Sequence, residues 1–309
     1  MPHLVCLAVL WILAATPLWA KDIFVNNVAG DDLNAGTMET SETPYAGPVR
    51  TIAKALRMVD KGDRILLAKT ETPYHESLSL STGRQWGTIT RPLTIVVNGA
   101  ILDGSAEVPH LAWEHHRENV FRFRPPLLTH QQLYLDGRPA ARKHFDRRTG
   151  AWPELEPLEW MLHDGHIYFR AEPGKLPADY PLRFTALQTG ITLYHVRHVR
   201  IEDLVVQGFQ LDGINVNDAV YECTLAGVLC RGNGRSGISI GGSSRAVVLD
   251  SRCGDNGEAQ VRSEGFSLGR LERVEIVANT APAFSVVGGR LLVDGQPVES
   301  DSPAPEPRE

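Results

Sequence analysis

The chain has 309 residues, of which 42% are hydrophobic and 22% charged, and its formal net charge at pH 7 is −6. This composition allows a large buried core and argues against a disordered, collagen-like or disulfide-scaffold protein. The 31 Lys and Arg residues form no basic block and are outnumbered by 37 Asp and Glu residues, so we expect no nucleic-acid partner. The 28 glycines and 20 prolines indicate many turns and favour an all-β chain.

Residues 1–20 have the pattern of a secretory leader. The stretch from Val5 to Trp19 is almost wholly apolar, and the charged chain starts at Lys21. The apolar run is short for a bilayer-spanning helix, which needs about 20 such residues. We therefore expect a signal peptide cleaved after Ala20 and a secreted, periplasmic or extracellular protein without a stable membrane span. An uncleaved membrane anchor is the alternative.

Residues 21–106 combine one short helix with strands. Three apolar residues at positions i, i+4 and i+7 predict a helix with one apolar face: Ile52, Leu56 and Val59. Gly62 begins a turn into a strand at 65–67, and a further strand region is expected over 93–103.

Residues 107–186 are rich in aromatic residues and histidines and show no period. The segments "LYLDGRPA" and "LHDGHIYF" each place an Asp-Gly turn between apolar residues, which is typical of β-hairpins. We expect this stretch to be a β-rich insertion packed against one flank of the remaining structure.

Residues 187–298 repeat with a period of 23 residues, a spacing typical of a stacked solenoid. The period is marked by Gln210, Asn233, Asn256 and Asn279. After each mark, two apolar residues alternate with small or polar ones: Ile214 and Val216, Ile238 and Ile240, Phe266 and Leu268, Phe284 and Val286. The spacing leaves no room for a helix, so each coil should consist of short strands and turns. The acidic, Pro-rich residues 299–309 are expected to form a frayed tail.

The segments "VRIEDLVV", "GFQLDGINV" and "GRSGISIGGSSRAVVLDS" resemble the right-handed parallel β-helix proteins of the pectin-lyase-like superfamily, many of them secreted and bacterial. The resemblance implies an all-β solenoid in which each coil contributes to three parallel sheets. It also implies that the helix in 21–106 caps the open end and that 187–298 forms the regular coils. The repeated Asn would sit in a tight turn, where Asn tolerates left-handed backbone and its amide bonds to the next coil.

The polysaccharide lyases with this fold, which the sequence resembles, use Ca²⁺ bound by acidic side chains and an Arg or Lys base. Strand alternation in "VRIED" points Arg200 and Glu202 outward, and we expect the equivalent acids on the next coils to lie about 5 Å apart. A Ca²⁺ site is thus expected at Glu202, Glu222 and Asp250. The candidate catalytic bases are Arg200, Arg252 and Lys143. The alternative is a solvated acid row offset by arginines.

A second candidate surface is a strip of small outward-facing residues that could hydrogen-bond to sugars: Asn215, Ser239, Ser267 and Ser285. A purely structural strip is the alternative. Beside the repeated Asn, a surface ion-pair row is expected at Asp212, Arg235 and Glu258. Cys230 and Cys253 fall on adjacent coils, as stacked thiols or as a disulfide, so with Cys223 at most one disulfide can form.

These patterns predict a monomeric secreted β-helix protein that binds or cleaves a polysaccharide. The leading hypothesis is a pectate-lyase-like β-elimination on uronate-containing glycans, with Ca²⁺ as the only cofactor. One alternative is a non-catalytic scaffold or surface-binding module. The other is a glycoside hydrolase, which would need a pair of carboxyl groups.

Overall fold

The computed structural model describes residues 20–126, 130–146 and 148–298. The expected leader (1–20, apart from Ala20) and the expected tail (299–309) lie outside these residues. Among the described helices, none is both long and apolar enough to cross a membrane.

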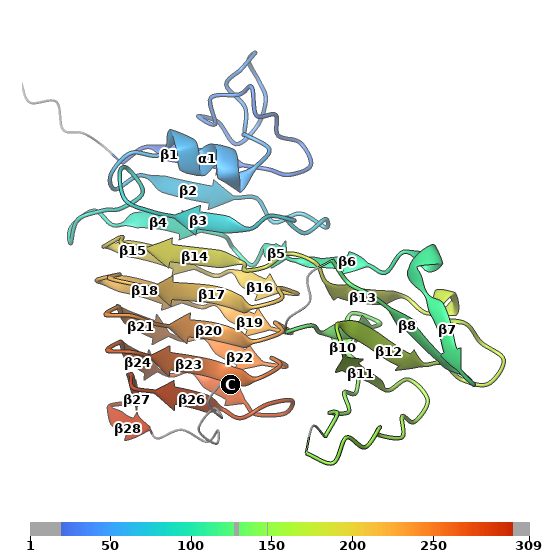
Figure 1. Ribbon diagram of the computed structural model, residues 1–309. Coiled ribbons are helices and arrows are strands. Elements are labelled where there is room, and N and C mark those ends of the chain that lie inside the picture. The colour runs from blue at the N-terminus through green and yellow to red at the C-terminus, as the bar shows by residue number, and fades with distance from the viewer. Residues whose placement is uncertain (1–19, 127–129, 147, 299–309) are drawn as a thin grey trace, which may run out of the picture.

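Three sheets form the walls of a solenoid, and their strands stack from the N-terminal to the C-terminal end (Figure 1). Sheet A consists, in spatial order, of β1 (Asp22–Val25), β2 (Arg64–Leu67), β4 (Leu93–Val96), β15 (Val199–Glu202), β18 (Cys223–Ala226), β21 (Arg245–Leu249), β24 (Leu268–Glu272), β27 (Arg290–Val293) and β28 (Gln296–Val298). Its strands pair in parallel except β27 with β28, which closes the C-terminal end.

Sheets B and C complete each coil and are parallel throughout. Sheet B consists of β5 (Ile101–Asp103), β16 (Val205–Gln207), β19 (Leu229–Arg231), β22 (Arg252–Gly254) and β25 (Glu275–Val277). Sheet C consists of β3 (Leu78–Leu80), β14 (Ile191–Tyr194), β17 (Asp212–Asn217), β20 (Ser236–Ile240), β23 (Ala259–Glu264) and β26 (Phe284–Val287). From β4 to β26 the chain runs from sheet A to B to C in each coil, which confirms the expected parallel β-helix.

The capping helix is also confirmed, as α1 (Ile52–Met58). Ile52, Leu56 and Val59 are buried, so the apolar face lies on the first coils. The Thr51 hydroxyl accepts a hydrogen bond from the Lys54 amide at 3.1 Å. The helix N-terminus is thereby capped where its amides lack partners within the helix.

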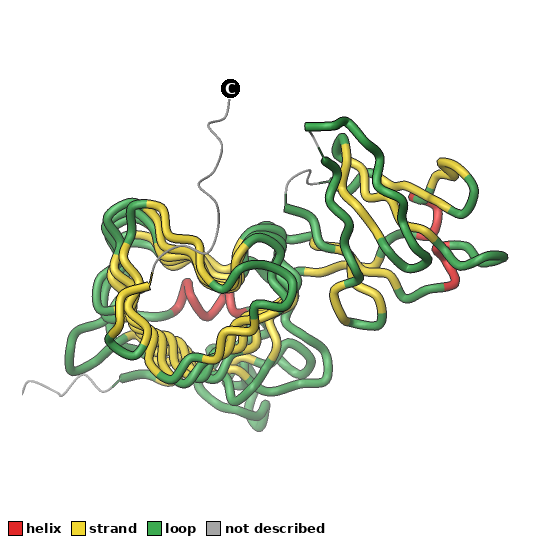
Figure 2. Tube along the Cα trace, turned by 90° about the horizontal axis from the view of Figure 1, so that it is seen from below, coloured by secondary structure: helices red, strands yellow, loops and turns green. Residues whose placement is uncertain are grey.

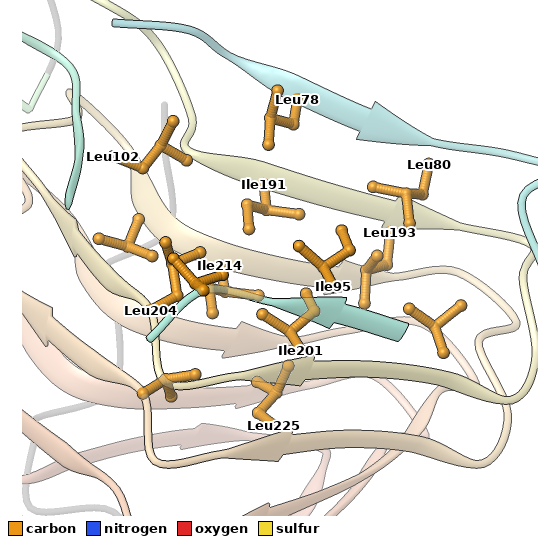
Figure 3. Packing of buried hydrophobic residues seen from close by; sticks show 14 of the residues in the cluster. Leu78, Leu80, Ile95, Leu102, Ile191, Leu193, Ile201, Leu204, Ile214 and Leu225 are labelled. Atoms are coloured by element: carbon orange, nitrogen blue, oxygen red, sulfur yellow. The ribbon is translucent and has the colours of Figure 1, made fainter. Parts of the chain in front are cut away.

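Apolar side chains from equivalent positions stack inside the solenoid (Figure 3). Ile95 pairs with Ile201 and Ile201 with Leu225, so one column of fully buried residues runs along sheet A. Burying a side chain of this size stabilises the fold by about 1.5–3 kcal/mol. One pair of the expected apolar pattern, Phe266 and Leu268, is wrong. In the third coil Val261 continues the column of Ile238 and Ser263 that of Ile240. Phe266 is 93% exposed, and Leu268 begins β24 of sheet A.

The amide ladder forms at the turn from sheet B to sheet C. The Asn233 amide group donates to Asn256 Oδ1 at 3.0 Å, and the Asn256 amide donates to Gln260 Oε1 at 2.8 Å. The left-handed backbone that we expected at the Asn belongs to the residue before it, Gly232 (φ 60°) or Asp255 (φ 60°). The ladder is therefore short and held by side chains.

The insertion leaves the solenoid after β5 and returns before β14. One antiparallel sheet contains β10 (Arg138–Pro139), β9 (Leu133–Leu135), β13 (Leu182–Thr185) and β6 (Ser105–Glu107). The other contains β11 (Trp160–His163), β12 (His166–Arg170), β8 (Val120–Phe123) and β7 (Glu114–Arg117). Two short 3₁₀ turns accompany them, His110–Ala112 and Pro177–Asp179. Figure 2 shows the insertion as a lobe beside one corner of the solenoid.

Candidate functional site

The three acids expected to share one position of successive coils do not do so, and that expectation is wrong. Glu202 ends β15 and pairs with Ala226, whereas Glu222 precedes β18 by one residue. At about 3.3 Å per residue, the two acids are offset by about 13 Å along the strands. Asp250 lies in the turn after β21, with a left-handed φ of 46°. The sequence spacing of the three acids indicated one shared position, but the strands and turns differ in length from coil to coil.

Two of these acids are also neutralised separately. Glu202 forms an ion pair with Arg200 two residues away on the same strand. Asp250 accepts two hydrogen bonds from Arg273, at 2.6 and 2.9 Å, which lower the pKa of its carboxyl group. Within the described ranges no three His, Cys, Asp or Glu side chains gather at a possible metal site. The three acids therefore do not fit a Ca²⁺ ion, and Ca²⁺ binding stays a prediction without this ligand set.

The three candidate bases lie on three different parts of the molecule. Arg200 belongs to sheet A, and Arg252 belongs to sheet B, where its Nε atom lies 3.5 Å from Glu275. Lys143 belongs to the insertion, where its Nζ atom lies 3.3 Å from Glu159. The structure does not bring these residues together.

Only the register of the expected sugar-binding strip exists on sheet C. Asn215 pairs with Ser239, and the row continues through Arg262 to Ser285. Ser239 is 2% exposed and Ser285 6% exposed, so the expectation of an open polar strip is wrong at both serines. Ser267 is 1% exposed and donates to the Ile240 carbonyl at 2.9 Å, so the expectation that it faces outward is wrong. It belongs to the turn after β23, because the strand begins earlier in this coil than the alternation indicated.

A cleft opens instead where the insertion meets the corner between sheets B and C, and we call it the corner cleft. Its volume is about 460 Å³, within the range of small-molecule binding sites. The solenoid contributes Asp103, Gln207, Arg231 and Asp255, and the insertion contributes Tyr134, Arg138 and Arg183.

Three contacts fix the insertion against the corner. The buried Tyr134 hydroxyl donates to the Gly232 carbonyl, and burial followed by the Asp103 charge raises the pKa of Tyr134 well above its usual value. His130 Nδ1 lies 2.8 Å from Glu258 Oε1. A side chain at Gly234 would place its Cβ atom 1.7 Å from the His130 carbonyl oxygen, so only glycine allows this approach.

The floor of the corner cleft is a hydrogen-bonded row on sheet B. Asp103 pairs with Gln207 and Gln207 with Arg231, so the three side chains lie on successive coils. Gln207 Nε2 donates to Asp103 Oδ2 at 3.0 Å, and Arg231 Nε donates to Gln207 Oε1 at 2.9 Å. The row fixes the Arg231 guanidinium through Nε alone, and its two terminal nitrogens have no partner among the described residues.

The two arginines that the insertion contributes to the corner cleft differ in their partners. Arg183 donates to the Ser105 side chain at 2.9 Å and to the Ser105 carbonyl at 2.8 Å, so it holds the wall in place. Arg138 is exposed in the β9–β10 hairpin and makes no hydrogen bond or ion pair with the described part of the chain. Arg138 and Arg231 therefore bring two available guanidinium groups to one cleft, one from each structural part.

The two carboxylates of the corner cleft, Asp103 and Asp255, also differ in how many of their oxygens already have partners. Asp103 uses both oxygens, because Ser105 N donates to Oδ1 at 2.7 Å and Gln207 donates to Oδ2. Asp255 accepts a hydrogen bond from Asn279 Nδ2 at 2.6 Å on Oδ1, and no described group bonds to its Oδ2. Asp255 is therefore the carboxylate of the cleft with an oxygen available to a ligand.

Sequence reasoning missed this cleft, although one signal was present. A polar residue precedes a glycine at the end of three sheet B strands, in Asp103-Gly104, Gln207-Gly208 and Arg231-Gly232. This recurrence marks an outward-facing row beside a turn. The partners across the cleft carry no such signal.

The comparisons with known proteins agree with this fold. A family model described as a right handed beta helix region matches residues 182–298. A solved structure described as a glycoside hydrolase has a TM-score of 0.60 and 12% identity, over 87% of this chain and 74% of its own. The structure of XylC with xylose has a TM-score of 0.49 and 13% identity, over 88% of this chain and 65% of its own. A rhamnogalacturonan lyase has a TM-score of 0.40 and 10% identity, over 89% of this chain and 67% of its own. No curated protein matches the sequence.

At 12% identity the likeness to the glycoside hydrolase structure shows the fold alone, and the two structures with TM-scores below 0.5 carry no argument. The expected right-handed parallel β-helix is confirmed by the family model over 182–298 and by the strand order of the three sheets. The chemistry has to be argued from the residues of the corner cleft.

Proposed function

We propose that the protein is a secreted polysaccharide-binding protein whose corner cleft binds the acidic sugars of a uronate-containing glycan. The observation that carries the proposal is the pair of available guanidinium groups, Arg138 and Arg231, in a cleft of about 460 Å³. A guanidinium binds a carboxylate through two parallel N–H···O bonds, which gives both affinity and orientation. Export through the expected leader at residues 1–20 would bring the cleft into contact with extracellular glycans.

Polar groups around the arginines suit the hydroxyl-rich remainder of a sugar. The Asp255 carboxylate accepts hydrogen bonds, and Asn279, which bonds to it at 2.6 Å, extends the polar rim. Because Arg183 and the Asp103–Gln207–Arg231 row are already hydrogen-bonded, the cleft is organised before the ligand arrives. Preorganisation of this kind reduces the entropic cost of binding.

Binding is tested by calorimetry with oligogalacturonates, and with neutral xylo-oligosaccharides as the uncharged comparison. Arg138→Ala and Arg231→Ala should each weaken oligogalacturonate binding by about tenfold or more, because each removes charged hydrogen bonds. Arg290→Ala, on the exposed face of sheet A, should leave the affinity unchanged. Equal affinity for neutral oligosaccharides, or unchanged affinity of both cleft variants, would overturn the proposal.

Cleavage by β-elimination is the second candidate function, and the Oδ2 atom of Asp255 is the observation that favours it. In that reaction a base removes the proton from the carbon next to the carboxylate, a C=C bond forms and the glycosidic oxygen leaves with the bonding electrons. Guanidinium groups that bind the carboxylate also stabilise the negative charge that develops on it. Asp255 would be the base.

The reaction type is decided by the products. A new C=C bond, measured by ultraviolet absorbance, indicates elimination, whereas new reducing ends without absorbance indicate hydrolysis. Asp255→Asn should abolish absorbance growth while retaining oligogalacturonate binding. Binding without products from the wild-type protein would refute the lyase candidate and favour a non-catalytic binding module.

A further inference from the structure

The insertion contains a second cationic position, Arg142, which is held rigidly next to the corner cleft. A parallel bridge pairs Arg142 with Trp160, and the neighbouring Lys143 amide donates to the Trp160 carbonyl at 2.8 Å. The Arg142 guanidinium lies over the ring of the fully buried Trp160, with its Cζ atom 4.9 Å from the ring centroid. Both backbone and side chain of Arg142 are therefore fixed.

Among the described residues, this guanidinium has no counter-ion of its own. Its Nε atom is buried without a hydrogen-bond partner, and no ion pair joins Arg142 to any other described residue. Burial lowers the pKa of Arg142, and the carboxylate that opposes this effect, Glu258, already contacts His130 at 2.8 Å and Arg262 at 3.7 Å. A partly buried cation without a partner is unfavourable unless an anion binds to it.

Two cavities meet at Arg142 and His144, with volumes of about 250 and 320 Å³. The first also contains Pro139, Asn279 and Thr280, which line the corner cleft as well. The corner cleft and the first cavity thus adjoin along the junction between solenoid and insertion. The second cavity continues from Arg142 and His144 into the insertion, where Asp164 also lines it. Burial, followed by the Arg142 charge, lowers the pKa of His144. Its neutral imidazole can both donate to and accept from sugar hydroxyls.

We infer that Arg142 and His144 form a second anion subsite, the arginine pocket, which binds the carboxylate of a further acidic sugar on the glycan held in the corner cleft. The inference rests on the proposed function and adds to it. The ligand is then an oligomer of acidic sugars long enough to pass Pro139 and reach both sites. Two carboxylate contacts on one chain raise the affinity because the second contact forms at high effective concentration.

The test compares the binding of short and long oligogalacturonates by calorimetry. In the wild-type protein the affinity should rise by about tenfold or more once the chain spans both sites, and then level off. Arg142→Met, which keeps an aliphatic side chain over Trp160, should lose this gain while retaining the affinity for short oligomers. Arg142→Lys, which keeps the charge without the planar fork, should retain part of the gain. Lys175→Met, at an exposed ion pair with Glu172, should behave as the wild type.

The outcomes separate the two proposals. If the wild-type protein binds short oligogalacturonates and longer ones no better, the arginine pocket is refuted and the corner cleft stands. An unchanged length gain in Arg142→Met, with native near-ultraviolet circular dichroism, refutes the pocket as well. If neither length binds, the proposed function itself fails. If Arg142→Met does not fold, Arg142→Lys decides the question. Partial loss of the affinity gain from short to long oligogalacturonates supports the inference. Full retention of that gain, with an affinity that depends only weakly on ionic strength, overturns it.

Discussion

Substitution of Asn256 by alanine is expected to remove the centre of the amide ladder. The Asn256 side chain is fully buried and makes four hydrogen bonds. Its Oδ1 atom accepts from the Asn233 backbone amide at 2.9 Å and from Asn233 Nδ2 at 3.0 Å. Its Nδ2 atom donates to the Cys230 carbonyl at 3.3 Å and to Gln260 Oε1 at 2.8 Å. Asn256→Ala removes this partner from all four groups. Gln260 Oε1 keeps the backbone amide of residue 256 at 3.2 Å, and Asn233 Nδ2 keeps the Val206 carbonyl at 3.4 Å.

A buried polar group without a partner costs about 1–3 kcal/mol. Because a water molecule in the vacated space can satisfy some of the four groups, we expect Asn256→Ala to lower the free energy of unfolding by about 3–6 kcal/mol. Asn279→Ala is the matched control, since Asn279 occupies the same place in the repeat. Asn279 is exposed and bonds only to Asp255 among the described residues, so its loss should cost about 1 kcal/mol or less.

Guanidinium chloride titration at 25 °C, followed by far- and near-ultraviolet circular dichroism, measures both variants. The midpoint of Asn256→Ala should shift with an unchanged m-value, so that the difference reports stability alone. Equal destabilisation by the two substitutions would refute the reasoning, because the repeat position would then matter and burial would not. The ladder would in that case be a sequence pattern without an energetic role.

Three further predictions follow from burial and charge. Cys230 and Cys253 are buried neighbours that form no disulfide. The pKa of the Cys230 thiol is raised well above its usual value, first by its hydrogen bond with Cys253 and then by burial. Neither thiol should react with a thiol reagent until the protein unfolds, and labelling of the native protein detected by mass spectrometry would contradict this. Gly234→Ala should detach the insertion from the solenoid, because the new Cβ atom collides with the His130 carbonyl. Tryptic cleavage within 107–186 should then be faster than in the wild type, and an unchanged cleavage rate would refute the prediction. Glu258 has a pKa below its usual value of 4.5, since its hydrogen bond to His130 and nearby arginines outweigh burial. Its stabilising effect is therefore present above pH 4.5 and lost as the pH falls through the folded-state pKa. Glu258→Gln should reduce the loss of unfolding free energy at acid pH. The same loss in the wild type and the variant would argue against the Glu258–His130 pair.

The fold could be predicted from the sequence because the solenoid repeats one local pattern. Asn233 and Asn256, 23 residues apart, form the ladder as expected. Asn279 does not join it, because the side-chain and backbone amides of Asn256 donate to Gln260 Oε1 instead. Its side chain bonds back to Asp255 instead. A period in the sequence indicates the repeat and cannot show where the stack ends.

The register within a coil was harder to predict, because its strands and turns vary in length. Glu202, Glu222 and Asp250 follow similar apolar patterns, yet the pairing places them at the end of a strand, before a strand and in a turn. For the expected ion-pair row of Asp212, Arg235 and Glu258, the structure agrees with the expectation in part. Arg235 forms a bidentate ion pair with Asp212, but Asp212 is fully buried where a surface position was expected.

The corner cleft could not be predicted because its walls come from distant parts of the chain. Asp103 and Arg231 belong to coils that precede and follow the insertion in the sequence, and Arg138 lies beside them because Tyr134 anchors its hairpin at Gly232. No local period records how a non-repeating segment docks. The two hairpin signals predicted β9 with β10 and β11 with β12, and they carried no information about the surface on which these strands dock.

A crystal structure of the protein with a bound oligogalacturonate tests the central claim most directly. We predict that the sugar lies in the corner cleft, with one carboxylate within hydrogen-bond distance of the Arg138 and Arg231 guanidinium groups. Sugar bound on the outer face of sheet A or along the Asn215–Ser239 row, with the corner cleft holding only solvent, would contradict the account.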